Sequence, residues 1–469
     1  MFHSSPARWS AILPAAGTLL LAGCATVGID DALQQANTRT RSFTEGKLTL
    51  ARTDAERQAR TALATDLLSR PLSQDDAVQL ALANSPAVQA LLAQAGAEIA
   101  GAVQSGRPAN PVFTFERMRL NPQLELDRLL SFGLLDLLLW PQRRSVAQNR
   151  EAEARLMLAG AIVDQVTQVR QAWVRAVGAQ QSLQYAGQVN EAAEASAELA
   201  RRMQQAGNFS PLQRARQQLF QSDAMARLAA ARHASIAARE ALVRALGLDD
   251  AQAARLQLPP RLPELPDAPR DAHEVAATAA AQRLDVQLAR ERLEIAGKSQ
   301  GMNLLPSFVG VDAGLRRDTV FDNGTGARGT RRGFELDIRL PLFDWGTAQR
   351  GAMDAQALAA AHRYDATVRD ATSRLREAYS GYRSAYDIAR HERDDVVPLR
   401  QSMADENLLR YNGMLIGVFE LLADARDQIA GVDAALQAQQ QFWLADAALA
   451  ASVIGRPIAS AASTSPLFE

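Results

Sequence analysis

The chain repeats one order of segments twice, and this internal duplication constrains its fold more than any other feature. The segment Leu80–Glu116 has a counterpart in Thr278–Asp312, and within them AEIAG at 97–101 corresponds to LEIAG at 293–297. Three single-residue matches extend the correspondence: Arg144 with Arg350, Gly207 with Gly413, and Gly247 with Gly455. A repeat of this length predicts one architecture built twice, although 469 residues would otherwise suggest about three domains.

Each copy is expected to contain one helix, a non-helical section bounded by prolines, and then two long helices. The first helix is expected over 74–105 and again over 272–300, opened in the first copy by the capping signal of Ser73 and Asp76. The long helices are expected over 143–205 and 211–246 in the first copy, and over 347–410 and 417–454 in the second. Each pair meets at a bend, so each copy should end in a helical hairpin with an elbow.

The length of these helices indicates how they must be stabilised. At about 1.5 Å per residue, the helix over 347–410 would span roughly 90 Å. A helix of that length cannot be buried in one compact domain, and it needs coiled-coil partners along its whole length.

The non-helical sections, over 108–140 and 306–345, have the alternating pattern of β-strands. Phe334, Leu336 and Ile338 alternate with the charged residues Glu335 and Asp337, and a glycine-rich turn precedes them. The first copy is less regular, because its alternation slips after residue 127. A membrane-spanning hairpin and a soluble, half-buried hairpin both give this pattern. Four strands per chain are too few to close a barrel, so several chains would have to combine in a membrane.

The N-terminus has the pattern of a secretory signal peptide. Arg8 precedes a short apolar region, and LAGC at 21–24 ends in the only cysteine of the chain, Cys24. A single cysteine cannot form an internal disulfide. LAGC resembles a bacterial lipobox, which implies lipidation of Cys24, and the absence of aspartate after it implies retention at the outer membrane.

Composition argues against two broad classes of function. A formal net charge of −1 is unlike that of a nucleic-acid-binding protein, which needs a basic surface. The five histidines are scattered and show no metal-ligand spacing, and neither a nucleophile elbow nor a phosphate-binding loop is present. We therefore expect no enzymatic activity, no metal site and no cofactor.

These patterns divide the chain into six segments. They are a signal peptide over 1–23, an extended lipidated segment over 24–72, repeat 1 over 73–257, a proline-rich linker over 258–271, repeat 2 over 272–456, and a flexible tail over 457–469.

The sequence resembles the TolC-like outer-membrane efflux proteins, in their lipoprotein branch. The resemblance rests on PLSQDDAVQLALANSPAV at 71–88, LPLFDWGTAQR at 340–350, the two elbows and the duplicated order of segments. It implies a mostly α-helical fold with a membrane β part, in which a homotrimer forms a 12-stranded β-barrel and a long α-helical barrel. It also implies a periplasmic adaptor and an inner-membrane transporter as partners, docked at the elbows.

The elbows carry the candidate site residues. The resemblance places the bends at Gly207 and Gly413 and a periplasmic gate beyond the second bend. Glu420 and Asp424 lie four residues apart on one helical face, so threefold symmetry would turn each into a ring of acids. We expect Tyr411, Glu420 and Asp424 to constrict the lumen, with Arg214 or Arg216 as latch partners.

One alternative remains open from the sequence: a periplasmic coiled-coil lipoprotein with a structural or adaptor role and soluble hairpins. The exported substrate, whether metal ions or organic molecules, is not indicated by any residue pattern.

Overall fold

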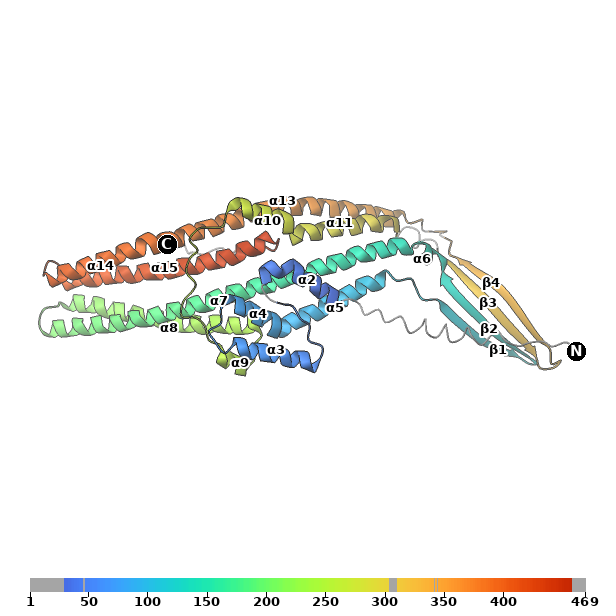
Figure 1. The fold of residues 1–469 in the computed structure, drawn as a ribbon, viewed down its shortest axis with the longest axis horizontal. Helices are drawn as coiled ribbons and strands as arrows, with labels where there is room; N and C mark the ends of the chain where they lie inside the picture. Colours follow the sequence, from blue (N-terminus) through green and yellow to red (C-terminus); the bar gives the residue numbers. More distant parts are fainter. Residues whose placement is uncertain (1–28, 45–46, 303–309, 341, 344, 458–469) are drawn as a thin grey trace.

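The computed structural model describes residues 29–457, apart from 45–46, 303–309, 341 and 344. Cys24 and the expected signal peptide and C-terminal tail therefore lie outside the described residues, except for Pro457. The chain is elongated, with a β-sheet at one end and two helical hairpins at the other (Figure 1). None of the helices in the described part of the chain is both long and apolar enough to cross a membrane.

Two long helical hairpins lie side by side. The first consists of α7 (Trp140–Gln205) and α8 (Pro211–Leu246). The second consists of α13 (Thr347–His391), α14 (Val397–Asn412) and α15 (Val418–Val453). Both turn at the end farthest from the sheet (Figure 1).

The helix expected over 347–410 is interrupted, which corrects the prediction of one continuous helix. A π-helical turn, η1 (Glu392–Val396), separates α13 from α14. Pro398 stands at the start of α14 and has no N–H to donate to the carbonyl four residues earlier. The chain accommodates this missing bond by widening one turn.

The shorter helices are also broken in both copies. Where one helix was expected, the first copy has α4 (Gln74–Asn84) and α5 (Pro86–Ser105), and the second has α10 (Ala272–Gln282) and α11 (Leu284–Met302). In the first copy Pro86 disfavours helical geometry at the preceding Ser85, which explains the break.

Two matched glycines pack against these breaks. Gly247 ends α8 with φ of +66°, and Gly455 follows α15 with φ of +85°. A Cβ on Gly247 would lie 2.7 Å from the Cα of Ser85, and one on Gly455 would lie 2.4 Å from Oδ1 of Asp285. Only glycine fits both the left-handed backbone and the close approach, so the two residues hold equivalent places in the two copies.

The segment over 24–72 was expected to be extended, and the structure corrects this. It contains α2 (Ile29–Thr44) and α3 (Asp54–Leu67), and α3 begins with a capping box between Thr53 and Glu56. Helix α2 packs on α7, and α3 packs on α4. Apolar burial against these neighbours stabilises helices that are too short to persist alone.

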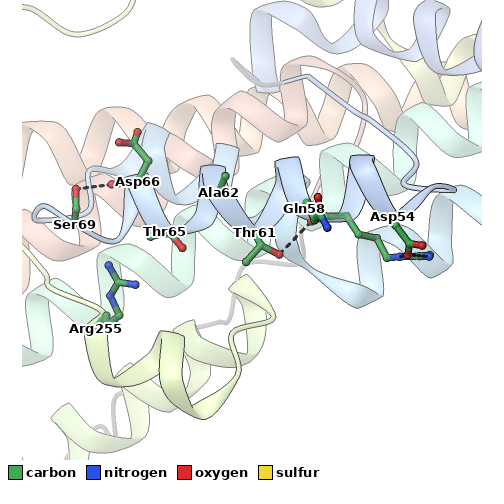
Figure 2. A pocket seen from close by; sticks show the side chains of 9 residues that line it. Asp54, Gln58, Thr61, Ala62, Thr65, Asp66, Ser69 and Arg255 are labelled. Atoms are coloured by element: carbon green, nitrogen blue, oxygen red, sulfur yellow. Dashed lines mark hydrogen bonds and ion pairs between the residues drawn. The ribbon is translucent and has the colours of Figure 1, made fainter.

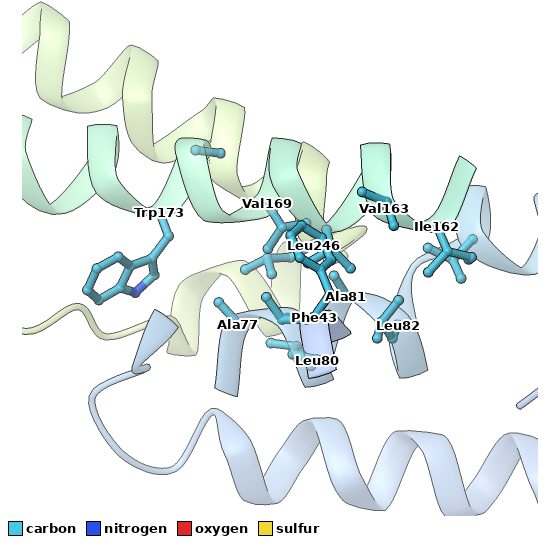
Figure 3. Packing of buried hydrophobic residues seen from close by; sticks show 14 of the residues in the cluster. Phe43, Ala77, Leu80, Ala81, Leu82, Ile162, Val163, Val169, Trp173 and Leu246 are labelled. Carbon is cyan, nitrogen blue, oxygen red and sulfur yellow. The ribbon is translucent and has the colours of Figure 1, made fainter. Parts of the chain in front are cut away.

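The largest hydrophobic core lies where these short helices pack on α7 and α8. Figure 3 shows Leu80 and Leu82 of α4 beside Val163 and Val169 of α7 and Leu246 of α8. The indole Nε1 of Trp173 donates a 2.8 Å hydrogen bond to the carbonyl of Leu72, which fixes the chain entering α4. A short helix, α9 (Asp250–Arg255), closes the first copy.

The proline-rich linker is held by an aromatic cluster of the second copy. Tyr382 and Tyr386 of α13 pack with Phe442 of α15, with ring centroids 5.7 Å apart in each pair. The hydroxyl of Tyr386 donates to the carbonyls of Pro266 and Asp267 at 3.1 and 3.0 Å. Carbonyls of the linker therefore find donors on the helices that it crosses.

The four strands form one antiparallel sheet in the order β1-β2-β3-β4. They are β1 (Val112–Leu120), β2 (Gln123–Gly133), β3 (Val311–Asp322) and β4 (Arg328–Ile338). The central β2–β3 pairing joins the two copies, and α6 (Leu134–Leu138) leads from β2 back to α7. The predicted fold class is confirmed for the single chain: long helices with a four-stranded sheet.

Candidate functional site at the helical elbows

The first elbow is a well-capped turn. Gly207 has φ of +79°, and the amide of Asn208 donates to the carbonyl of Met203 at 2.8 Å, which satisfies a free carbonyl at the end of α7. Helix α8 then begins with a capping box between Ser210 and Gln213, and Pro211 follows the cap. The predicted role of Gly207 therefore agrees with its left-handed backbone.

The second elbow is built differently. Its left-handed residue is Met414, with φ of +62°, whereas Gly413 has φ of −79°. The amide of Leu415 donates to the carbonyl of Arg410 at 2.9 Å, so the turn has the same hydrogen bond as the first elbow. Gly413 was expected to be the elbow glycine, but the residue that needs left-handed geometry is the one after it.

The second elbow also lacks a side-chain cap and exposes apolar residues. Helix α15 begins after Gly417, which has no side chain to accept from the first amides of the helix. Met414 is 92% exposed and Leu415 is 78% exposed, with Leu409 of α14 also exposed. Large apolar side chains gathered at an exposed tip are typical of a protein-docking surface.

The three predicted gate residues lie near this elbow but are not brought into one cluster with the predicted latch residues. Glu420 and Tyr411 are exposed, and Asp424 is partly buried. Arg214 donates to Oε1 of Gln204 on its own hairpin at 2.9 Å. Within the described part of the single chain, neither Arg214 nor Arg216 forms an ion pair with an acid. A latch between chains stays a prediction.

The contact that links the two hairpins near the elbows was not predicted. Arg426 of α15 donates a 2.8 Å hydrogen bond to Oε1 of Gln217 on α8. Its guanidinium also lies 4.4 Å from the ring centroid of Phe220. Ser196 of α7 donates to the same Gln217 oxygen at 3.1 Å, so one buried amide joins three helices. No local sequence pattern pairs Arg426 with a residue about two hundred positions away, so the sequence alone did not predict this contact.

A second contact between the hairpins lies further from the tip. The hydroxyl of Tyr185 on α7 donates to the carbonyl of Ile429 on α15 at 3.3 Å. Burial and the charge of Asp433 raise the pKa of Tyr185 to about 12. Burial raises the pKa of Asp433 itself, and nearby Arg227 offsets part of that increase. The hairpin contact therefore contains an acid that is easier to protonate than usual.

A hollow lies on the outside of the short helices. It is lined mainly by α3 and by Arg255 of α9 (Figure 2). Two of its three hydroxyls donate to nearby carbonyls of the same segment: Thr61 to that of Arg57, and Ser69 to that of Asp66. Neither hydroxyl is hydrogen-bonded to a base that would activate it as a nucleophile.

The sheet at the opposite end exposes an apolar face. Phe113, Leu130, Leu315 and Phe334 lie in register across the four strands and form one exposed apolar row. On the other face Arg316 forms ion pairs with Asp127 at 3.3 Å, Asp318 at 3.0 Å and Glu335 at 3.4 Å. An exposed apolar face opposite a charged face is the arrangement of membrane β-barrels.

Solved structures that this chain resembles in fold include three outer-membrane proteins. The outer membrane protein VceC of Vibrio cholerae matches with a TM-score of 0.66 and 15% identity, over 85% of this chain and 98% of that one. The Campylobacter jejuni CmeC outer membrane channel matches with a TM-score of 0.66 and 13% identity, over 88% and 90% of the two chains. The Neisseria gonorrhoeae MtrE outer membrane channel matches with a TM-score of 0.60 and 19% identity, over 85% and 89%.

The chain has the TolC-like fold. The resemblance predicted from the sequence is thus confirmed at the level of fold. No protein-family model matches the sequence, and no curated protein matches it. In this fold the elbows lie at one end of the molecule and the sheet lies at the other (Figure 1).

Proposed function

We propose that three copies of this chain form the outer-membrane exit channel of a tripartite efflux pump. The carrying observation is the sheet: its apolar face is exposed, and its edges β1 and β4 pair with no strand in the described part of the chain. Unpaired strand edges are not tolerated in lipid. Three four-stranded sheets joined edge to edge would give one closed barrel of twelve strands.

The helices support the same assembly. Several large apolar residues of the long helices are exposed in the single chain: Leu219, Met225, Ile236, Leu358, Leu399 and Met403. Helices of this length need lateral partners along their whole extent. Packing of the two hairpins against those of neighbouring chains would cover these residues and enclose a lumen.

The elbows would then form the periplasmic end of the channel. We place the gate at Tyr411, Glu420 and Asp424 of the second elbow, with Arg214 or Arg216 of a neighbouring hairpin as latch partners. The exposed Met414 and Leu415 would be a docking surface for a periplasmic adaptor, through which an inner-membrane transporter delivers substrate. Lipidation at Cys24 would anchor the chain in the outer membrane. No enzymatic step is proposed.

Extraction and conductance test this function against the alternative of a soluble coiled-coil lipoprotein. The Cys24→Ser variant should stay in the outer-membrane fraction, require detergent for extraction, and elute as a trimer. After reconstitution it should conduct ions in a planar bilayer. Release of the variant as a soluble monomer would instead support the structural or adaptor role.

A further inference from the structure

The two faces of the sheet are sorted by charge. Strand alternation and the cross-strand register place every acidic residue of the four strands on one face: Glu116, Glu125, Asp127, Asp312, Asp318, Asp322, Glu335 and Asp337. The opposite face, which carries the apolar row of Phe113, Leu130, Leu315 and Phe334, has no acidic strand residue. Such complete sorting is not needed for solubility or for strand pairing.

The apolar face becomes basic toward the hairpin turns. Beyond the apolar row, in the half of the sheet farthest from the helices, it carries six arginines, which we name the arginine belt: Arg117, Arg119, Arg128, Arg317, Arg328 and Arg332. Arg317 and Arg332 are directly opposite each other on β3 and β4. On β4 the belt extends from Arg332 to Arg328, about 13 Å at roughly 3.3 Å per residue.

The belt has no counter-charge of its own. Among the described residues, none of the six forms an ion pair with a carboxylate, although the neighbouring Arg316 and Arg331 on the other face are paired with acids. Arg128 donates to the hydroxyl of Thr319 at 3.3 Å, and Arg328 lies over the ring of Phe321. Like charges directly opposite on adjacent strands are destabilising, so an anion from outside the sheet would stabilise the pair Arg317 and Arg332.

Assembly does not supply that anion. This step rests on the proposed function, in which β4 of one chain lies beside β1 of the next. Joining those edges brings Arg328 and Arg332 near the neighbour's arginines, and the neighbour's face also lacks acids because its sequence is identical. The trimer would therefore concentrate positive charge around the outside of the barrel.

We propose that the arginine belt binds the phosphate groups of anionic lipids in the outer leaflet of the outer membrane. The apolar row and the belt share one face, so a lipid-facing row makes the belt lipid-facing as well. With the helices in the periplasm, the turn end of the sheet reaches the outer leaflet. Arginine is costly at the centre of a bilayer but much less so at its interface. Its planar guanidinium pairs with phosphate through two hydrogen bonds.

Lipid A is the probe, compared with dephosphorylated lipid A of the same acyl composition. The full-length trimer in neutral detergent is titrated with each lipid, and bound lipid is measured by native mass spectrometry. The wild type should bind the phosphorylated form more tightly, and added salt should weaken the preference. The R317Q/R332Q variant should bind it about tenfold more weakly and lose the preference.

The R316Q/R331Q variant is a matched control. It removes the same charge from adjacent positions of the same strands, but on the opposite face, and it should keep the preference for the phosphorylated lipid. Equal binding of both lipids by the wild type, or equal loss in both variants, overturns the proposal.

Conductance separates this result from a failure of the proposed function. The wild type and both variants should run as trimers and conduct in a neutral phosphatidylcholine bilayer. A wild-type trimer that conducts but shows no preference for the phosphorylated lipid contradicts only the lipid-binding role of the arginine belt. Absence of a trimer and of conductance contradicts the proposed function and, with it, the proposal that the arginine belt binds lipid.

Discussion

Arg426 and Gln217 join the two helical hairpins through a 2.8 Å hydrogen bond, and the guanidinium of Arg426 also lies over the ring of Phe220. The two hairpins come from different copies of the repeat, and this contact is one of two polar contacts described above that hold them together. Any movement that opens the elbows by parting the hairpins has to break it.

We predict that Arg426→Ala loosens the hairpins and raises the conductance of the resting channel. Loss of the charge-assisted hydrogen bond and of the cation–π contact should destabilise the hairpin contact by about 1–3 kcal/mol. The distance between spin labels on α8 and α15 should become longer and more broadly distributed. Arg410→Ala is the control, because Arg410 pairs with Glu406 one helical turn earlier on its own helix. An unchanged distance distribution in the Arg426 variant would contradict this role.

The second elbow should open more readily than the first. Met414 has a left-handed backbone that is costly for a residue with a Cβ, and Gly417 offers no cap, whereas the first elbow has Gly207 and Ser210 at the corresponding places. Hydrogen exchange should be faster over 413–418 than over 206–211.

Met414→Gly should remove that strain, stabilise the second elbow by about 1 kcal/mol, and slow its exchange about fivefold. Gly207→Ala should have the opposite effect on the first elbow. Faster exchange in the Met414→Gly variant would show that the methionine side chain matters more than its backbone geometry.

The predicted gate can be tested at Asp424. If the acids form a ring in the trimer, Asp424→Ala should reduce the preference for cations over anions and raise the resting conductance. The control is Asp405→Ala, an exposed acid of α14. Equal ion selectivity in wild type and Asp424→Ala would exclude this residue from the constriction.

The contact between the hairpins at Tyr185 should depend on pH through the nearby Asp433. Burial raises the pKa of this carboxyl above its ordinary value of 3.8. Between these two pKa values the folded state keeps a proton that the unfolded state has released. The stabilisation from this group is therefore fully present below pH 3.8, and it decreases as the pH rises through the higher pKa of the folded state. Asp433→Asn should flatten this part of the thermal stability profile measured from pH 4 to 7. If the stability profiles of the wild type and the variant run parallel, other groups cause the pH dependence.

The strands of the second copy could be predicted because alternation is a local property. Phe334, Leu336 and Ile338 are separated by charged residues, and the period alone identifies β4. The helix break at Ser85 could have been read from Pro86, and the widened turn before α14 from Pro398. These were local signals that the long helical pattern obscured.

Other features depend on residues far apart in the chain. Helix α2 depends on a surface supplied by α7, so its own sequence did not indicate it, whereas the capping box of Thr53 and Glu56 was a local signal for α3 that the prediction of an extended segment missed. The left-handed residue of the second elbow is Met414 because the hydrogen bond to Arg410 fixes the turn, whereas the repeat match with Gly207 and the family resemblance pointed to Gly413. The hydrogen bond between Arg426 and Gln217 requires knowledge of how the two copies pack.

Cysteine cross-linking between chains tests the central claim, a barrel closed by edges β1 and β4, most directly. In the Cys24→Ser background, one cysteine replaces Thr114 on β1 and a second replaces Gly333, Glu335 or Asp337 on β4, all on the charged face. Within one chain these edges are three strands apart, about 14 Å, which is too far for a disulfide. We predict that at least one pair gives a disulfide-linked trimer in the outer membrane, sensitive to reductant. If every pair remains monomeric there, the barrel is not closed by these edges.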